Sequence, residues 1–528
     1  MGELPRLPPA GKGFAVRIRC LPPRLFVAAG PAVVAWLGLT SPASAHGFAG
    51  QPYILPAPLA VYLVAGGAVV LLSFALMVTF VGGTGREELA GSRLTLPILA
   101  RPAVVSAARI VGGVLGVVAL LAVLVVGWFG PQTPPTANLA EYIVWIYCWA
   151  FLVIVTGLLG NLWALLNPWS ALYDLAARLS GRRTPWPARR PYPVRWGWWP
   201  AIGGYFAFAW FELASGVSNH PAILATLAAA YSVYTFCMLA IFGRDAWLRH
   251  GELFSVLFNL IGRFGPTEVR AVDPLACRSC HSGCSGEYTS CINCYECFRT
   301  ARRREVNLRP WAVGLLTQRI APTWDRILFV ILTLSTLAFD GVLATGPWNA
   351  LLLATFPDNE AGQALLRTIG LLALTLLFFL AFYLVISLVR RAGGRTGSLP
   401  ELGALFALTL VPIALVYNAA HNYTYMLLVG QGGIPLLSDP FGRGWNLFGT
   451  RQYRVSTALT ASGTVWYVQL LLIVVGHVIA VYLAHRRANA VYRRPSVALA
   501  SQYPLLVLMV LYTMTSLWIL AQPITTEA

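Results

Sequence analysis

The sequence predicts an all-α membrane protein, a polytopic bundle of about ten transmembrane helices that follows a signal peptide and carries a small cysteine-rich cytoplasmic loop module. Three observations lead to this prediction. The 528 residues are 57% hydrophobic and only 11% charged, whereas a soluble domain carries about 25% charged residues. Apolar runs long enough to cross a bilayer follow one another along the chain. Six of the nine cysteines fall within residues 277–298.

The N-terminal segment, residues 1–45, has the three parts of a secretory signal peptide. Basic residues are scattered through 1–25, an apolar run extends from Phe26 to Leu39, and a small-residue stretch ends at Ala45. This order is typical of a signal peptide, so cleavage is expected after Ala45. An uncleaved first anchor is the alternative. Both versions place the mature N-terminus outside the membrane.

Ten apolar runs after this segment predict the spans, each meeting or approaching the length of about 20 residues that a bilayer requires. A long polar loop at 244–324 separates five spans within 46–243 from five within 325–528. The shortest run is 198–216. The runs are 57–83, 104–130, 141–167, 198–216, 222–243, 325–347, 365–389, 402–426, 461–484 and 504–522.

Arginine sets the expected orientation of these spans. The net charge is +18, and positive residues concentrate in cytoplasmic loops. Arg367 and the outer loop 427–460 are exceptions to the pattern. A soluble protein with this charge would suggest nucleic acid, but arginines between apolar runs indicate anionic membrane lipid as the partner and no nucleic acid. The arginine-rich loops are 84–103, 168–197, 244–324, 390–401 and 485–503.

The alternation predicts a multi-pass protein of the bacterial plasma (inner) membrane with the cysteine loop in the cytoplasm. That compartment is reducing, so structural disulfides are not expected there. The stretch CRSCH, residues 277–281, matches the haem c attachment pattern. Covalent haem attachment is an outer-face process in bacteria, however, so an inner loop argues against it. We expect a metal site whose candidate ligands are Cys277, Cys280, Cys284, Cys291, Cys294 and Cys297.

Zinc and an iron–sulfur cluster both suit these thiolates. Zinc would use a C-x2-C-x10-C-x2-C pattern, formed by Cys277, Cys280, Cys291 and Cys294. The segment CINCYEC, residues 291–297, resembles the first three ligands of a bacterial ferredoxin run, C-x2-C-x2-C-x3-C-P. Ala301 and Arg302 stand where that run has its fourth cysteine and proline. The resemblance implies an iron–sulfur cluster as the cofactor, with zinc as the alternative, and a fourth ligand from Cys277, Cys280 or Cys284.

Residues 244–265 are expected to form an amphipathic helix, because Trp247, Phe254 and Leu257 share a face with other apolar residues while Glu252 falls opposite. Such a helix would lie on the inner membrane surface and hold the cysteine module near the bilayer. The alternative is a short inward extension of the preceding span, packed against its neighbours.

Ionisable residues inside spans are costly and point to function. Glu212, Asp340 and His421 lie at similar levels in the outer half of their spans, and we expect them to meet in an intramembrane polar pocket. His477 lies deeper. For each residue alone, the alternative is an ordinary interhelical hydrogen bond worth about 0.6 kcal/mol.

The whole chain resembles a multi-pass bacterial membrane protein of unknown activity, from HGFAGQPYILPAPLAVYL near the start to YPLLVLMVLYTMTSLWILAQPI near the end. The cysteine pattern favours an integral membrane redox protein that exchanges electrons with quinone or a cytosolic electron-transfer partner, and that need not be an enzyme. The alternatives are a membrane permease and a metal-handling or assembly protein, each with a structural zinc-binding loop. No phosphate-binding, dinucleotide-binding or serine-hydrolase motif is present.

Overall fold

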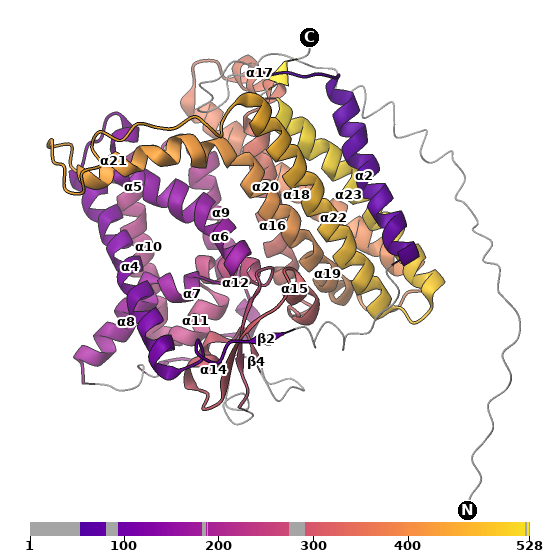
Figure 1. Ribbon diagram of the computed structural model, residues 1–528, viewed down its shortest axis with the longest axis horizontal. Coiled ribbons are helices and arrows are strands. Elements are labelled where there is room, and N and C mark those ends of the chain that lie inside the picture. The colour runs from indigo at the N-terminus through magenta and orange to yellow at the C-terminus, as the bar shows by residue number, and fades with distance from the viewer. Residues whose placement is uncertain are drawn as a thin grey trace, which may run out of the picture. The chain divides into compact units, whose positions relative to one another are not determined.

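The computed structural model describes residues 53–80, 93–181, 186, 188–273, 291–522 and 525–526. This part of the chain is an all-α bundle with a small four-stranded sheet at one end and a two-stranded pair, β1 (Tyr53–Ile54) with β6 (Thr525–Thr526), elsewhere (Figure 1). The predicted signal peptide lies outside the described residues. Within them, nine helical segments are long and apolar enough to cross a membrane, which confirms the multi-pass prediction. Six are continuous helices, namely α2 (Leu59–Phe80), α4 (Pro102–Phe129), α10 (Pro221–Phe242), α16 (Trp324–Leu343), α18 (Glu360–Ala392) and α22 (Ser462–Val491).

The other three spans have irregularities. In α23 (Pro495–Ala521), Pro504 lies inside the helix. Pro412 lies in the seventh span, where its missing N–H explains the 3₁₀ turn that precedes it. A stretch of π-helix interrupts the third span. The third span combines α5 (Leu139–Glu141), η2 (Tyr142–Phe151) and α6 (Leu152–Leu159), and the seventh combines α19 (Leu399–Ala407), η4 (Leu408–Leu410) and α20 (Val411–His421).

The pairing of two short terminal strands decides how many times the chain crosses the bundle. Strand β1 (Tyr53–Ile54) pairs in parallel with β6 (Thr525–Thr526), so the first and last spans begin and end at the same end of the bundle. Nine crossings would leave these strands at opposite ends. Helix α9 (Trp199–Leu213) supplies the tenth crossing, although at 15 residues it is shorter than the other spans.

The small sheet joins two of the loops that were predicted to share one side of the membrane. Its order is β2 (Leu94–Thr95), β5 (Arg304–Leu308), β3 (Thr267–Ala271), β4 (Cys291–Ile292), and every pair is antiparallel. Because β2 follows α2 and β5 precedes α16, their pairing places both loops at the same end of the bundle. Sequence analysis did not predict this sheet.

Residues 244–265 form two helices rather than one, and neither is a surface helix. Helix α11 (Arg244–His250) ends at Gly251, and α12 (Leu253–Gly262) follows. Helix α12 is buried on nearly all sides and packs against α6, α9 and α7 (Trp163–Leu166). The predicted helix on the membrane surface is therefore wrong. The segment packs on its neighbours, as the alternative expected, but Gly243, with a φ of 79°, separates it from α10, so it is not a continuous extension of that span.

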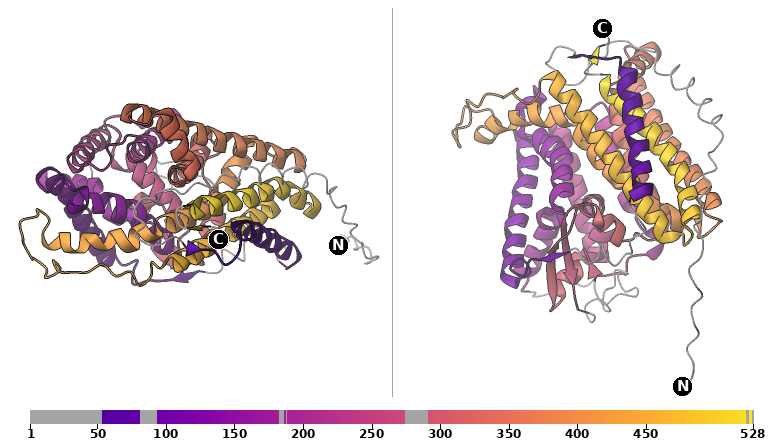
Figure 2. Two further views of the ribbon diagram at one scale, coloured as in Figure 1. Left: turned by 90° about the horizontal axis from the view of Figure 1, so that it is seen from above. Right: turned by 45° about the vertical axis from the view of Figure 1, so that its right-hand side comes forward.

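Further short helices surround the spans. The Asn167 side chain caps α8, and Pro168 occupies the first turn of that helix. Figure 2 shows that α2 lies along the C-terminal helices, where it packs against α22 and α23. The remaining short helices are η1 (Pro135–Ala137), α8 (Pro168–Leu179), η3 (Val194–Trp196), α14 (Tyr295–Thr300), α15 (Val313–Thr317), α17 (Gly346–Thr355), η5 (Tyr425–Val429), η6 (Gly430–Gly432) and α21 (Gly433–Ser438).

Candidate functional site

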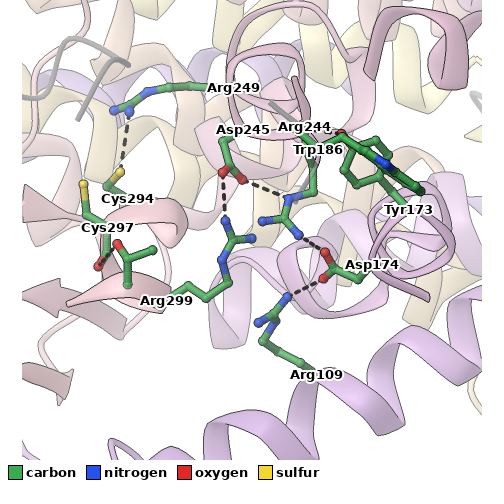
Figure 3. Close-up of polar contacts among 11 residues, drawn as sticks. Arg109, Tyr173, Asp174, Trp186, Arg244, Asp245, Arg249, Cys294, Cys297 and Arg299 are labelled. Atoms are coloured by element: carbon green, nitrogen blue, oxygen red, sulfur yellow. Dashed lines mark hydrogen bonds and ion pairs between the residues drawn. The ribbon is translucent and has the colours of Figure 1, made fainter. Parts of the chain in front are cut away.

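Three of the predicted ligand cysteines gather at the β4 edge of the sheet. Cys291 begins β4 and pairs with Ala271 of β3, whereas Cys294 and Cys297 lie at the start of α14. The three side chains form one buried cluster with Ala271 and Ala301 and are at most 4% exposed. A spacing of three residues at a helix start places two side chains on one face, and Figure 3 shows the sulfurs of Cys294 and Cys297 side by side.

Asn293 fixes the turn that carries Cys291 and Cys294. Its backbone N–H donates to the Val269 carbonyl at 2.8 Å, and its side-chain oxygen accepts from the Val269 N–H at 3.0 Å. Asn293 has a φ of 51°, a left-handed conformation that asparagine tolerates better than most residues. The turn between these cysteines is therefore attached to β3 at both backbone groups of Val269.

A chain of alternating charges connects the cysteine cluster to the helices of the bundle. Arg249 of α11 donates to Cys294 Sγ at 3.5 Å. Beside it, ion pairs lead from α14 through α11 and α8 to α4 (Figure 3). Burial raises the pKa of the Asp245 carboxyl in this chain, and the adjacent Arg244 opposes that rise. The pairs are Arg299–Asp245 (2.8 Å), Arg244–Asp245 (3.0 Å), Arg244–Asp174 and Arg109–Asp174 (2.7 Å).

The three clustered cysteine sulfurs are of the kind that bind iron or zinc, but the described residues do not supply a complete set of ligands. Soft sulfur ligands suit both iron–sulfur clusters and zinc, and the nearby arginine offsets negative charge on the sulfurs. Cys277, Cys280 and Cys284 lie outside the described residues. Over the ranges that the structure does describe, no three His, Cys, Asp or Glu side chains are arranged to hold a metal ion.

The three intramembrane polar residues come together from three helices. The Nε2 atom of His421, at the end of α20, lies 3.0 Å from Oδ2 of Asp340 on α16. Glu212 of α9 is close enough to interact electrostatically with Asp340, and Tyr425 of η5 interacts with both carboxyls. The Asp340 and His421 side chains are 31% and 19% exposed, so the pair is only partly buried.

Glu252 is a fully buried carboxylate, which sequence analysis placed on the polar face of a surface helix. It caps α12 by accepting hydrogen bonds from the N–H groups of Phe254 and Ser255. The Tyr231 hydroxyl, from the middle of α10, donates to it at 2.8 Å, and Asn167 and Trp163 approach it at 3.4 Å. Burial raises the pKa of Glu252, and these hydrogen bonds oppose the rise.

His250 connects α11 to the start of α16. Arg326 Nη2 lies 3.2 Å from His250 Nδ1, and because arginine can only donate, this nitrogen must be unprotonated. The Tyr192 ring stacks on the imidazole with ring centres 5.4 Å apart. Burial lowers the pKa of His250 to about 3, with further lowering by Arg326 and Arg249.

A lowered histidine pKa predicts a loss of stability in acid. The unfolded chain binds a proton at His250 below its ordinary pKa of about 6.5, whereas the folded protein does so only near pH 3. Stability should therefore fall as the pH decreases through this window. In detergent, the melting temperature of His250→Gln should depend less on pH than that of the wild type. The exposed His220→Gln is the control, and equal pH dependence in all three proteins would contradict the assignment.

No protein-family model, no curated protein and no solved structure matches this chain.

Proposed function

We propose that this chain is a membrane electron-transfer protein whose redox centre is an iron–sulfur cluster held by cysteines of residues 277–297. The observation that carries the proposal is the buried cluster of Cys291, Cys294 and Cys297 at the β4 edge of the sheet. Their C-x2-C-x2-C spacing is that of a ferredoxin run. Arg249 lies against Cys294, where a positive charge favours the thiolate form that binds metal.

The fold supplies a reason why the remaining ligands come from nearby. Strands β3 and β4 pair with Ala271 opposite Cys291, so the two ends of the 274–290 connection start from adjacent points. Cys277, Cys280 and Cys284 lie in that connection. A cluster needs a fourth thiolate where Ala301 replaces the cysteine of the ferredoxin run, and one of these three is the proposed source.

The module also adjoins the membrane bundle. The charge chain from Arg299 to Arg109 and the strand β2 connect it to the first spans. A bound cluster would supply one-electron transfer, and the chain would hold it beside the bundle. Quinone in the membrane and a cytosolic electron-transfer protein are the proposed partners. The excess of arginine in the loops on this side supports a cytoplasmic position at the plasma membrane of a bacterium.

The test is a visible absorption spectrum of anaerobically purified protein, with iron, zinc and acid-labile sulfide assayed on the same sample. We expect absorbance near about 400 nm that dithionite bleaches, together with iron and sulfide. The double variant Cys291→Ser and Cys294→Ser should lose the absorbance and the metal. The double variant Cys148→Ser and Cys237→Ser is the matched control, because these cysteines lie on η2 and α10, and it should keep both.

Two results would overturn the proposal. An unchanged metal content in the double variant Cys291→Ser and Cys294→Ser would contradict the assignment of these cysteines as ligands. Colourless protein with stoichiometric zinc would make the module a structural clip. The second outcome would favour the other candidate, a membrane permease, for which the meeting of Glu212, Asp340 and His421 is the supporting observation. A permease of this kind should lose uptake in the Asp340→Asn variant.

A further inference from the structure

Two carboxylates at the end of the bundle away from the sheet lack a positive partner (Figure 1). Glu141, at the start of α5, is 8% exposed, and Glu212, in the last turn of α9, is partly buried. Among the described residues, neither carboxylate forms an ion pair. Other buried carboxylates are compensated: Glu268 pairs with Arg309, and Glu252 accepts hydrogen bonds from two N–H groups and a tyrosine hydroxyl. A buried carboxylate without compensation is costly, so this pair requires an explanation.

These two carboxylates lie close to the Asp340–His421 pair. The Tyr425 hydroxyl of η5 interacts electrostatically with Glu141, Glu212 and Asp340, and Glu212 also interacts with Asp340. Asp340 lies in the last turn of α16 and His421 ends α20, so the four groups share one end of the bundle. A protonated His421 balances one of the three carboxylates. Two negative charges therefore remain without a counter-charge when all three acids are ionised.

A buried hydroxyl without a partner lies beside this group of acids. Tyr417 of α20 is fully buried, and its hydroxyl has no hydrogen-bond partner among the described residues. Its ring stacks on the His421 imidazole with centres 6.0 Å apart. The hydroxyl lies so close to Gly341, the residue after Asp340, that a Cβ there would collide with it. Buried polar groups are nearly always paired, so this hydroxyl indicates that a bound molecule completes the site.

Indole rings lie beside two of the carboxyl groups. Trp145 is next to Glu141. Trp149 is next to Glu212. Both tryptophans contact Phe208 of α9, with ring centres 5.4 Å and 4.8 Å from that of the phenylalanine. A cation is attracted both to a carboxylate and to the face of an aromatic ring, so this lining favours a ligand with a positive group and an apolar body.

The two stretches of π-helix in the described part of the chain meet at this place. One is η2, which carries both tryptophans, and the other is η5, which carries Tyr425. The Tyr147 hydroxyl of η2 donates to the carbonyl of Gly430, directly after η5, at 2.8 Å. Stretches of π-helix are rare and occur frequently at functional sites, so their meeting supports a binding role for this end of the bundle.

The spacing of the acids argues against a bare metal ion as the ligand. Oxygen ligands lie about 2.0 to 2.6 Å from magnesium or calcium. Within the described ranges, no three His, Cys, Asp or Glu side chains are close enough together to hold such an ion. An organic ammonium ion is larger, and it can contact carboxylates that are too far apart to share a metal.

We propose that Glu141, Glu212 and Asp340 form the binding site of an organic ammonium ion, the protonated form of an alkyl or aryl amine. The carboxylates and the Tyr417 hydroxyl accept hydrogen bonds from the ammonium N–H groups, and the two indoles contact the apolar part of the ligand. The assignment goes beyond electron transfer and does not depend on the metal of the cysteine module. It also names a class of solute for the alternative permease, although binding by itself does not require transport.

The test measures the binding of phenethylammonium to the full-length protein in detergent, by titration calorimetry and by the melting temperature. Phenethyl alcohol is the neutral counterpart of the same shape, and ammonium chloride controls for a small inorganic cation. Phenethylammonium should bind saturably and raise the melting temperature, because it binds only the folded protein, and neither control should do so. Glu212→Gln and Asp340→Asn should each lower the affinity by about tenfold or more, because each removes a charge that contacts the ligand.

Glu360→Gln is the matched control, because Glu360 begins α18 at the same end of the bundle but is exposed. It should bind phenethylammonium as the wild type does. All three variants should keep the wild-type visible spectrum and metal content, so a failure of this proposal is distinct from a failure of the redox centre. The proposal is overturned if phenethylammonium does not bind, if phenethyl alcohol or ammonium chloride binds equally well, or if Glu212→Gln and Asp340→Asn keep the wild-type affinity.

Discussion

Replacing Glu268 by alanine is expected to lower the free energy of unfolding of the sheet module by about 3 to 5 kcal/mol. Glu268 lies on β3 and is fully buried. One carboxylate oxygen is 2.8 Å from Arg309 Nη1, and the other is 3.1 Å from Arg93 Nε. The Arg309 side chain is also fully buried. Removing the carboxylate leaves that guanidinium buried without its counter-charge, and this is the origin of the large effect.

Thermal unfolding in detergent, together with limited proteolysis of the loop, measures this effect. Because Arg93 precedes β2 and Arg309 follows β5, the variant should expose the sheet to protease while the spans stay folded. Glu305→Ala is the control, since Glu305 is 37% exposed and its nearest contact with Arg270 is 3.7 Å. It should cost about 0.5 kcal/mol or less. An equal loss of unfolding free energy in Glu268→Ala and Glu305→Ala would contradict the role given to the buried ion pair of Glu268.

Replacing Glu252 by alanine should also destabilise the protein, by about 3 kcal/mol or more, because hydrogen bonds to a buried charged group contribute about 1.5 to 3 kcal/mol each. The variant would leave the Tyr231 hydroxyl, the Ser255 N–H and the Ser255 hydroxyl without their acceptor. Helix α12 would also lose its N-terminal cap.

The melting temperature and hydrogen exchange of α12 amides test this expectation. Glu401→Ala is a matched control, because Glu401 also caps a helix by accepting a hydrogen bond from the Ser398 N–H. Its carboxylate is exposed, so water can replace its partners and the loss should be clearly smaller. Wild-type exchange rates in α12 of Glu252→Ala would contradict the proposed capping role.

The spans could be predicted because a bilayer imposes one length and one composition on every crossing. The run 222–243, for example, corresponds to α10 at Pro221–Phe242. The tenth crossing was the weakest prediction, since the apolar pattern of α9 is short. It follows from the pairing of β1 with β6.

The sheet could not be predicted, because the strand pattern depends on partners distant in sequence. In β3 the buried positions are Glu268 and Ala271. No alternation of apolar and polar residues therefore marks the strand. Helix α12 shows the same limitation. An amphipathic pattern does not reveal whether its polar face meets water or, as for Glu252, polar groups of other helices.

The polar pocket could be predicted in part. Similar depth along three spans predicted that Glu212, Asp340 and His421 would meet. Asp340 and His421 lie 3.0 Å apart, and Glu212 is close enough to Asp340 to interact with it electrostatically. The difference in depth separated His477 from His421.

The position of α2 has a consequence for the assembly of the chain. This helix packs against α22 and α23, which are synthesised after the other described spans, with Gly66 and Gly67 allowing close approach of side chains from α23. Its packing face therefore stays without its partners until α22 and α23 have entered the membrane. Docking of α2 is then a late step that completes the bundle, and a nascent chain stalled before α22 would leave this face open to chaperones or proteases.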